Sequence, residues 1–164
     1  MTALGSSCRD ALLRFAGLDL GAWAGLPACT LADVETLWRP SDAAARPVVL
    51  GHETAEARHF DTGSGWVRVW SRDGNVVLVD VDGPLELDVA ALGAPDARLL
   101  AHAGFASYPD ADLVFAARGL AVGIAPESGV VHYAAVFVPC SVEEYVERLR
   151  VDRVQRPAPA GGMR

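Results

Sequence analysis

The stretch that decides the expected fold is GWVRVWSRDGNVVLVDVD, residues 65–82. Asp73-Gly74, near its centre, is a preferred dipeptide of the tight type I′ turn. The residues on either side are rich in the β-branched and aromatic types that favour strands. The sequence therefore predicts an antiparallel hairpin, with one strand over 65–72 and the other over 75–82.

The register of this hairpin follows from its turn. A two-residue loop pairs Arg72 with Asn75, and by the same count it pairs Trp70 with Val77. The large residues of one face are then Trp66, Arg68, Trp70, Val77, Val79 and Val81. The other face is also apolar, although a sheet with one face in water would alternate apolar and polar residues. We therefore expect both faces to be covered. The few helices suffice for one face and part of the second, and a partner, a second copy or an enclosed ligand covers the remainder.

Outward from the hairpin, short segments of the same kind alternate with turn residues. Further strands are expected over 57–61, 97–101, 112–117, 120–125 and 130–138. Helices are expected over 8–16, 18–26, 30–38, 87–92 and 141–151. This mixture predicts an α+β fold built around a curved antiparallel sheet.

A pattern of four positions recurs along the chain. The matched positions are Asp33, Val34, Leu37 and Pro40, then Asp88, Val89, Leu92 and Pro95. The offset is 55 residues throughout, as position 33 becomes 88 and position 40 becomes 95. We interpret the pattern as two helix–strand–strand–strand repeats, over about 30–84 and 85–139, with a flanking helix at each terminus. They form a single domain over 1–155, followed by a disordered tail over 156–164.

The two copies resemble the tandem helix-plus-meander units of the secreted β-lactamase inhibitor proteins and of the small outer-membrane-assembly lipoproteins. Each copy has a capped short helix with Val and then Leu, a Pro after it, and a small antiparallel meander. The residues that match are Thr30, Val34, Leu37 and Pro40, then Val89, Leu92, Gly93 and Pro95. The resemblance implies a curved sheet of two units whose concave face grips another protein.

The charge of the chain narrows the classes of partner. All 14 basic residues are arginine, which excludes a P-loop, a kinase-type lysine and Schiff-base or pyridoxal chemistry. The formal net charge of −7 repels phosphate backbones, so we expect no nucleic-acid partner. The same charge favours association with a basic protein. The sequence holds no motif for a nucleotide or a catalytic metal, and we expect no cofactor.

The cysteines and the N-terminal segment give information on the cellular compartment of the protein. Cys8, Cys29 and Cys140 are odd in number and contain no C-x-x-C pair, so we expect buried reduced thiols without a disulfide or a metal site. The apolar stretch over 12–28 is interrupted by charged and small residues, and it fits neither a signal peptide nor a membrane span. We expect a cytoplasmic protein that does not contact a membrane.

Trp66, Arg68 and Trp70 are the first candidate binding residues, because Trp and Arg dominate interface hot spots. Alternation along a strand places all three on one face, where they would anchor a partner or stack on a planar ligand. The alternative is a core face on which Arg68 stacks against an indole. Tyr108 and Asp110, which lie in an expected turn, are further candidate binding residues.

Five residues are candidates for catalysis, each with a structural alternative. His59 and Asp61 share a strand face, where a carboxylate orients an imidazole; the alternative is two solvated residues on an edge strand. His132 and Tyr133 lie on opposite faces of an apolar strand, and the alternative is a buried histidine with a satisfied ring. Cys140 precedes a helix, whose N-terminus lowers a thiol pKa; the alternative is an inert buried thiol.

Two function classes remain. The first is a non-enzymatic binding protein, such as an immunity or inhibitor protein, that presents its aromatic sheet face to a basic protein partner. The second is a small biosynthetic enzyme, a cyclase or isomerase, that works through the shape of an apolar cavity. Homodimerisation through a sheet face is a third alternative.

Overall fold

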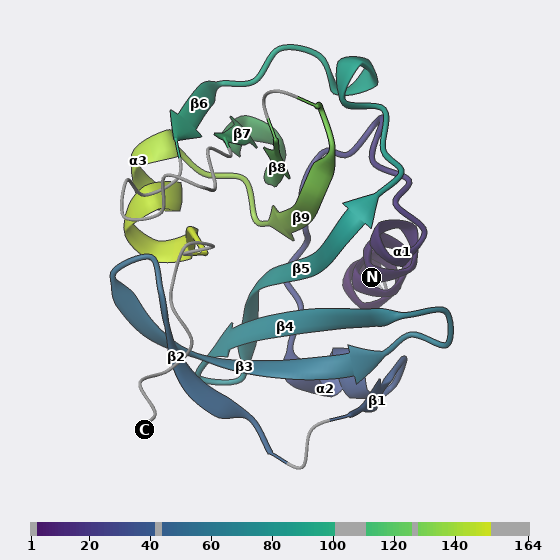
Figure 1. The fold of residues 1–164 in the computed structure, drawn as a ribbon. Coiled ribbons are helices and arrows are strands. Elements are labelled where there is room, and N and C mark those ends of the chain that lie inside the picture. The colour runs from purple at the N-terminus through teal and green to yellow at the C-terminus, as the bar shows by residue number, and fades with distance from the viewer. Residues whose placement is uncertain (1–2, 42–43, 101–110, 126–127, 152–164) are drawn as a thin grey trace, which may run out of the picture.

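Figure 1 shows the computed structural model, which describes residues 3–41, 44–100, 111–125 and 128–151. Its strands are β1 (Arg39–Pro40), β2 (Arg46–Leu50), β3 (Glu53–Asp61), β4 (Trp66–Arg72), β5 (Asn75–Leu85), β6 (Ala97–Leu100), β7 (Ala111–Phe115), β8 (Leu120–Ile124) and β9 (Val131–Phe137). Its α-helices are α1 (Ala3–Ala16), α2 (Leu31–Glu35) and α3 (Val142–Glu144). There are also the 3-10 segments η1 (Val89–Leu92) and η2 (Ala116–Arg118), and a π-helical segment, η3 (Tyr145–Leu149). None of the helices in the described residues is long and apolar enough to cross a lipid bilayer.

The nine strands of the described residues belong to one antiparallel sheet. Its order is β1-β3-β4-β5-β9-β8-β7-β6, and β2 also pairs with β3. β3, β4 and β5 follow one another as a meander, and so do β7, β8 and β9. β5 pairs with β9, so the last strand lies in the middle of the sheet (Figure 1).

This single sheet contradicts the expected pair of helix–strand–strand–strand repeats. The first expected helix does form, as α2, and Thr30 and Asp33 make a reciprocal capping box at its start. In the second expected unit, Val89–Leu92 is only a short 3-10 turn, and the edge strand β6 follows it. The recurring Val, Leu and Pro positions mark where the chain turns, whereas strand pairing joins everything into one sheet. The two-unit architecture implied by the resemblance is therefore wrong as well.

One face of the sheet is covered by the N-terminal part of the chain. α1, α2 and the segment between them supply Leu12, Phe15, Trp23, Leu26 and Val34 to the larger apolar core. The buried sheet residues that meet them are Phe60, Val67, Val69, Val79, Val122, Val131 and Val136. The removal of these side chains from water is the main term that holds the helices against the sheet.

Residues 18–26, expected as a helix, are irregular in the structure. The guanidinium of Arg118 holds this segment in place. It donates hydrogen bonds of 2.6–3.2 Å to three carbonyls of this segment, those of Leu20, Gly21 and Trp23, and to that of Leu92 at the end of η1. The backbone polar groups that a helix would have satisfied are thus partly satisfied by one rigid side chain.

A disulfide joins Cys8 in α1 to Cys29, just before α2, so the expectation of three reduced thiols is wrong. The two cysteines are 21 residues apart and become neighbours only when α1 packs beside the start of α2. A cross-link over a loop of this length stabilises a fold by about 3 kcal/mol in the chain-entropy model. Disulfides persist mainly in oxidising compartments, so this bond does not support the expected cytoplasmic location.

The second face is covered over part of its area by the C-terminal helical segment. Tyr145, Leu149 and Val151 form a second apolar core with sheet residues such as Leu78 and Phe137. The rings of Phe137 and Tyr145 lie 5.0 Å apart. The chain's own elements thus form an apolar core on each face of the sheet, and the second face is covered only in part. Among the described residues, the exposed large apolar side chains are Leu13, Val49, Trp66, Leu100, Val130 and Val138.

Candidate functional site

The β4–β5 hairpin forms as expected, but its register changes after the turn. Arg72 pairs with Asn75 as predicted. A β-bulge then places Val77 as an extra residue, so that Trp70 lies opposite Leu78. The predicted pairing of Trp70 with Val77 is therefore wrong.

The shift by one residue brings Asp80 opposite Arg68. Arg68 donates to the two carboxylate oxygens of Asp80 from Nε at 3.1 Å and from Nη2 at 2.7 Å. The indole Nε1 of Trp70 donates to the same carboxylate at 2.8 Å. Asp80 is fully buried, so this paired arrangement offsets the cost of taking its charge out of water.

The three expected binding residues Trp66, Arg68 and Trp70 do not share one environment. Trp70 is only 5% exposed and lies in the second core, and the guanidinium of Arg68 lies 4.8 Å from the centre of its ring. For Trp70 and Arg68 the alternative is therefore correct: they belong to a core face on which Arg68 stacks against an indole. Trp66 is different, because 56% of it is exposed.

Beyond the Arg68–Asp80 pair, β4 and β5 part from each other. Trp66 pairs with Asp61 on β3, whereas Asp82 pairs with Tyr133 on β9. Figure 1 shows the two strands moving apart. The space beside them is a hollow of about 400 Å³ lined by His59, Gly65, Trp66, Val67, Arg68, Asp80, Val81 and Asp82. We refer to it as the β4–β5 hollow.

The rim of the β4–β5 hollow combines an indole with carboxylates. Trp66 and Asp82 are exposed, and His59 is half-buried. Asp61 is exposed opposite Trp66 in the register, and one of its oxygens accepts a hydrogen bond from the backbone N–H of Gly63 at 2.8 Å. His59 and Asp61 thus lie on the same strand face, as the sequence predicted.

A second buried carboxylate, Asp112, lies on the same face of the sheet near its other edge. It accepts a hydrogen bond from the hydroxyl of Tyr133 and another from Nε of Arg150 at 2.8 Å. The ring of Tyr133 lies where any side chain at position 123 would be, so Gly123 is what lets Tyr133 cross β8. Tyr133, a candidate catalytic residue, is therefore engaged in an internal hydrogen bond.

His132 is not a buried histidine. β9 has an irregularity between the pairs Gly123–Tyr133 and Ile124–Val131, and His132 falls in it and is exposed. The expected position of His132 on an apolar face is therefore wrong. Its exposed ring and the bound hydroxyl of Tyr133 do not converge on a common cavity in the described residues.

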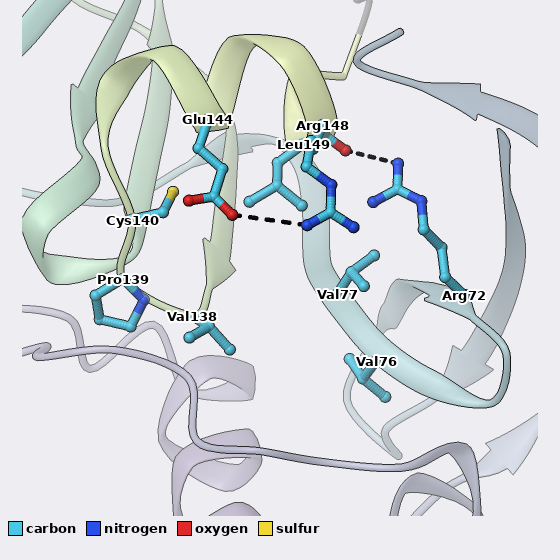
Figure 2. A pocket seen from close by; sticks show the side chains of 9 residues that line it. All are labelled: Arg72, Val76, Val77, Val138, Pro139, Cys140, Glu144, Arg148 and Leu149. Carbon is cyan, nitrogen blue, oxygen red and sulfur yellow. Dashed lines mark hydrogen bonds and ion pairs between the residues drawn. The ribbon is translucent and has the colours of Figure 1, made fainter. Parts of the chain in front are cut away.

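Cys140 lines a different pocket, between the β4–β5 hairpin and the C-terminal helical segment (Figure 2). Burial, and to a lesser degree the charge of Glu144, raises the pKa of its thiol to about 11. A helix N-terminus was expected to lower this pKa, but α3 has only three residues and carries acids in its first turn. The thiol is protonated at neutral pH and is not an activated nucleophile.

Several residues of these sites escaped the sequence analysis. Asp80 and Arg150 were not singled out, although an acidic residue such as Asp80 within an apolar strand indicates that a buried partner is present. Tyr108 and Asp110 lie outside the described residues. In the part of the chain that the structure describes, no three His, Cys, Asp or Glu side chains gather closely enough to hold a metal ion.

Comparison of the chain with protein-family models, with curated proteins and with solved structures finds no match. The resemblance to β-lactamase inhibitor proteins therefore rests on the positions quoted above alone. The function has to be inferred from the geometry of the β4–β5 hollow and of the pocket beside Cys140.

Proposed function

We propose that the protein is a non-enzymatic binding protein, of the immunity or inhibitor kind, that engages a basic protein partner at the β4–β5 hollow. The observation that supports this most is the exposed indole of Trp66 beside the exposed carboxylates of Asp61 and Asp82. The basis of the proposal is this rim and not an uncovered apolar face, because both faces bury apolar cores.

The charges around the hollow favour a cationic group. Arg68 is neutralised by the two hydrogen bonds that it donates to Asp80. Two exposed acidic residues lie here, Asp82 in the lining of the hollow and Asp61 opposite Trp66 on β3. The net charge of −7 has the same sign, so a basic partner is attracted at long range before the local contacts form.

The indole of Trp66 adds an attraction that is specific for cations. A guanidinium or ammonium over a Trp ring gains about 0.5–1 kcal/mol at an exposed site and about 2 kcal/mol when it is desolvated. Trp70 makes this interaction inside the protein, with Arg68. Trp66 offers the same ring type in an exposed position to an Arg or Lys side chain of a partner.

The other function classes have less support. The candidate catalytic residues His132, Tyr133 and Cys140 are separated, since one is exposed in a bulge, one is bound to Asp112 and one lines another pocket. A symmetric homodimer through the rim would bring two acidic surfaces together, and like charges oppose such a contact.

The proposal is tested with a short Arg-rich peptide and a matched peptide in which citrulline replaces each Arg. Citrulline has nearly the same shape but no charge, so only the Arg peptide is expected to bind. Of the four tryptophans only Trp66 is well exposed, because Trp23, Trp38 and Trp70 are 2%, 6% and 5% exposed. Quenching of the intrinsic fluorescence by the bound peptide therefore reports on Trp66.

Variants locate the binding on the rim. Trp66→Ala and Asp82→Asn are each expected to weaken binding of the Arg peptide about tenfold in calorimetric titration. Leu13→Ala, at another exposed apolar residue, is the matched control and leaves the affinity unchanged. Equal affinity for the citrulline peptide, or full affinity in Trp66→Ala, would refute the proposal. Light scattering over a range of concentrations is expected to show a monomer.

A further inference from the structure

The pocket beside Cys140 is independent of the β4–β5 hollow. It lies between the turn end of β4 and β5, the end of β9 and the α3–η3 segment, as Figure 2 shows. Its volume is about 250 Å³. This is slightly below the range of roughly 300–1,000 Å³ that is common for small-molecule sites, so the pocket suits a small ligand.

Part of the pocket wall is apolar and open to solvent. Val77, the extra residue of the β-bulge, and Leu149 of η3 both line it (Figure 2). Val138, just after β9, lines it too and is 47% exposed. A short hydrocarbon chain that lies on these side chains removes apolar surface from water.

Arg72 supplies an unused donor to the same pocket. Its Nε donates to the carbonyl of Thr54 at 2.9 Å, and its Nη2 donates to the carbonyls of Leu50 and Arg148 at 3.1 and 2.7 Å. These bonds fix the plane of the guanidinium. Its remaining nitrogen, Nη1, is buried and has no hydrogen-bond partner in the described residues. Buried donors are nearly always satisfied, so we expect this one to bind a water molecule or the acceptor atom of a ligand.

A second guanidinium, that of Arg148, lies beside that of Arg72 in the pocket (Figure 2). Arg148 is 45% exposed, and its Nη1 lies 3.6 Å from a carboxylate oxygen of Glu144. Burial lowers the pKa of Arg72, the charge of Arg148 lowers it further, and Glu53 opposes both effects. One oxygen of Glu53 lies 3.1 Å from Nε of Arg148 and 3.8 Å from Nε of Arg72, so one carboxylate already contacts both cations. An acceptor on the open side of the pocket would meet Arg72 Nη1 and compete with Glu144 for Arg148.

We infer that this pocket binds a small carboxylic acid with a short hydrocarbon chain. Its carboxylate accepts from Arg72 Nη1 and from Arg148, and its chain lies on Val77, Val138 and Leu149. To admit it, the half-exposed Arg148 side chain turns from Glu144 toward the ligand. The protonated thiol of Cys140 adds no negative charge that would repel the carboxylate.

Cys140 provides a reporter inside the pocket. It is the one free thiol of the chain, since Cys8 and Cys29 form a disulfide. Iodoacetamide at about pH 9 alkylates it slowly, through the small fraction of thiolate. Hexanoate is expected to slow this alkylation in a saturable way. Hexanol and hexylammonium have the same chain with a neutral or a cationic head and are expected to give no protection.

Two charge variants are expected to change the affinity for hexanoate in opposite directions. Arg148→Gln is expected to weaken hexanoate protection about tenfold, because it removes a charged donor. Glu144→Gln is expected to tighten it severalfold, because it removes the competing carboxylate. Glu143→Gln, on the same helix but outside the pocket, is the matched control and leaves the affinity unchanged. For each variant the alkylation rate of Cys140 with hexanoate is compared with the rate without it, since Glu144 also affects the pKa of the thiol.

The inference is overturned if hexanol protects as well as hexanoate, since the head group is then not recognised. It is also overturned if hexanoate gives no protection, or if Glu144→Gln weakens the protection. Circular dichroism of each variant verifies that the fold is intact. Failure here leaves the proposed function untouched, because the Arg peptide is tested at the other site.

Discussion

Asp80 and Asp112 are two buried carboxylates on one face of the sheet, and their surroundings differ. Each is bound by an arginine and by one aromatic donor. Around Asp112 the strands β7, β8 and β9 stay paired, and Arg150 also donates to the carbonyl of Leu100 on the edge strand at 2.8 Å. Beside Asp80 the strands β4 and β5 part, and a hollow opens.

This difference shows that a buried ion pair does not by itself open a hollow in the sheet. The chemistry of the two carboxylates is nearly the same, so their roles follow from the strand pairing next to them. Where pairing continues, the ion pair ties strands together. Where pairing ends, it forms one wall of a hollow whose rim carries Trp66 and Asp82.

The largest expected effect is a difference between Asp80 and Asp112 in the stability lost when each is replaced by Ala. Asp80→Ala leaves Arg68 and the indole N–H of Trp70 without their acceptor, and we expect a loss of about 3–5 kcal/mol in the free energy of unfolding. Asp112→Ala is expected to cost about 2–3 kcal/mol, because Arg150 keeps the carbonyl of Leu100. Urea denaturation measures both.

The control for this pair is Asp10→Ala, an exposed acid on α1, which is expected to be nearly neutral. Equal losses at Asp80 and Asp112 would mean that the number of donors does not distinguish the two positions. A larger loss at Asp112 would reverse the comparison.

Gly123→Ala is expected to have the next largest effect and to act on the Asp112 side only. A Cβ at this position would fall on the ring of Tyr133, so the ring must move and its hydroxyl leaves Asp112. We expect a loss of about 1–3 kcal/mol, as for other overpacking substitutions. In the double variant with Tyr133→Ala the two losses are expected to be less than additive, and full additivity would contradict the proposed contact.

Local chemistry made part of the fold predictable. Asp73-Gly74 gave the hairpin turn, and Thr30 with Asp33 gave the start of α2, because turn and cap preferences depend on neighbouring residues only. The bulge at Val77 was not predictable in this way. It lies in the apolar run Val76–Val79, where a shift of one residue leaves both faces apolar and so leaves no trace in the pattern.

The candidate site was predictable to the same limited extent. Trp66 and Arg68 were predicted as binding residues and His59 as a candidate catalytic residue, and the structure places all three around one hollow. The partner of Arg68 was missed, because the register that brings Asp80 opposite it depends on the bulge. The disulfide was missed for a related reason, since distant residues meet only through tertiary packing.

Arg150→Gln tests whether the Asp112–Arg150 pair stabilises the edge strand β6. It removes the hydrogen bonds to Asp112 and to the carbonyl of Leu100. We expect hydrogen exchange of the β6 amides to become about tenfold faster, with little change in the central strands. Arg68→Gln is the matched substitution at the other carboxylate and is expected to leave β6 protection unchanged.

Trp66→Ala has the smallest expected effect on stability and separates the two regions most clearly. Because 56% of this residue is exposed, we expect the free energy of unfolding to change by less than about 0.5 kcal/mol. The same substitution weakens binding of the Arg peptide about tenfold if the hollow is the site. Stability and binding are then separable beside Asp80, where the strands part. Around Asp112 strand pairing continues, so changes to Tyr133 or Arg150 are expected to affect stability and not binding of the peptide.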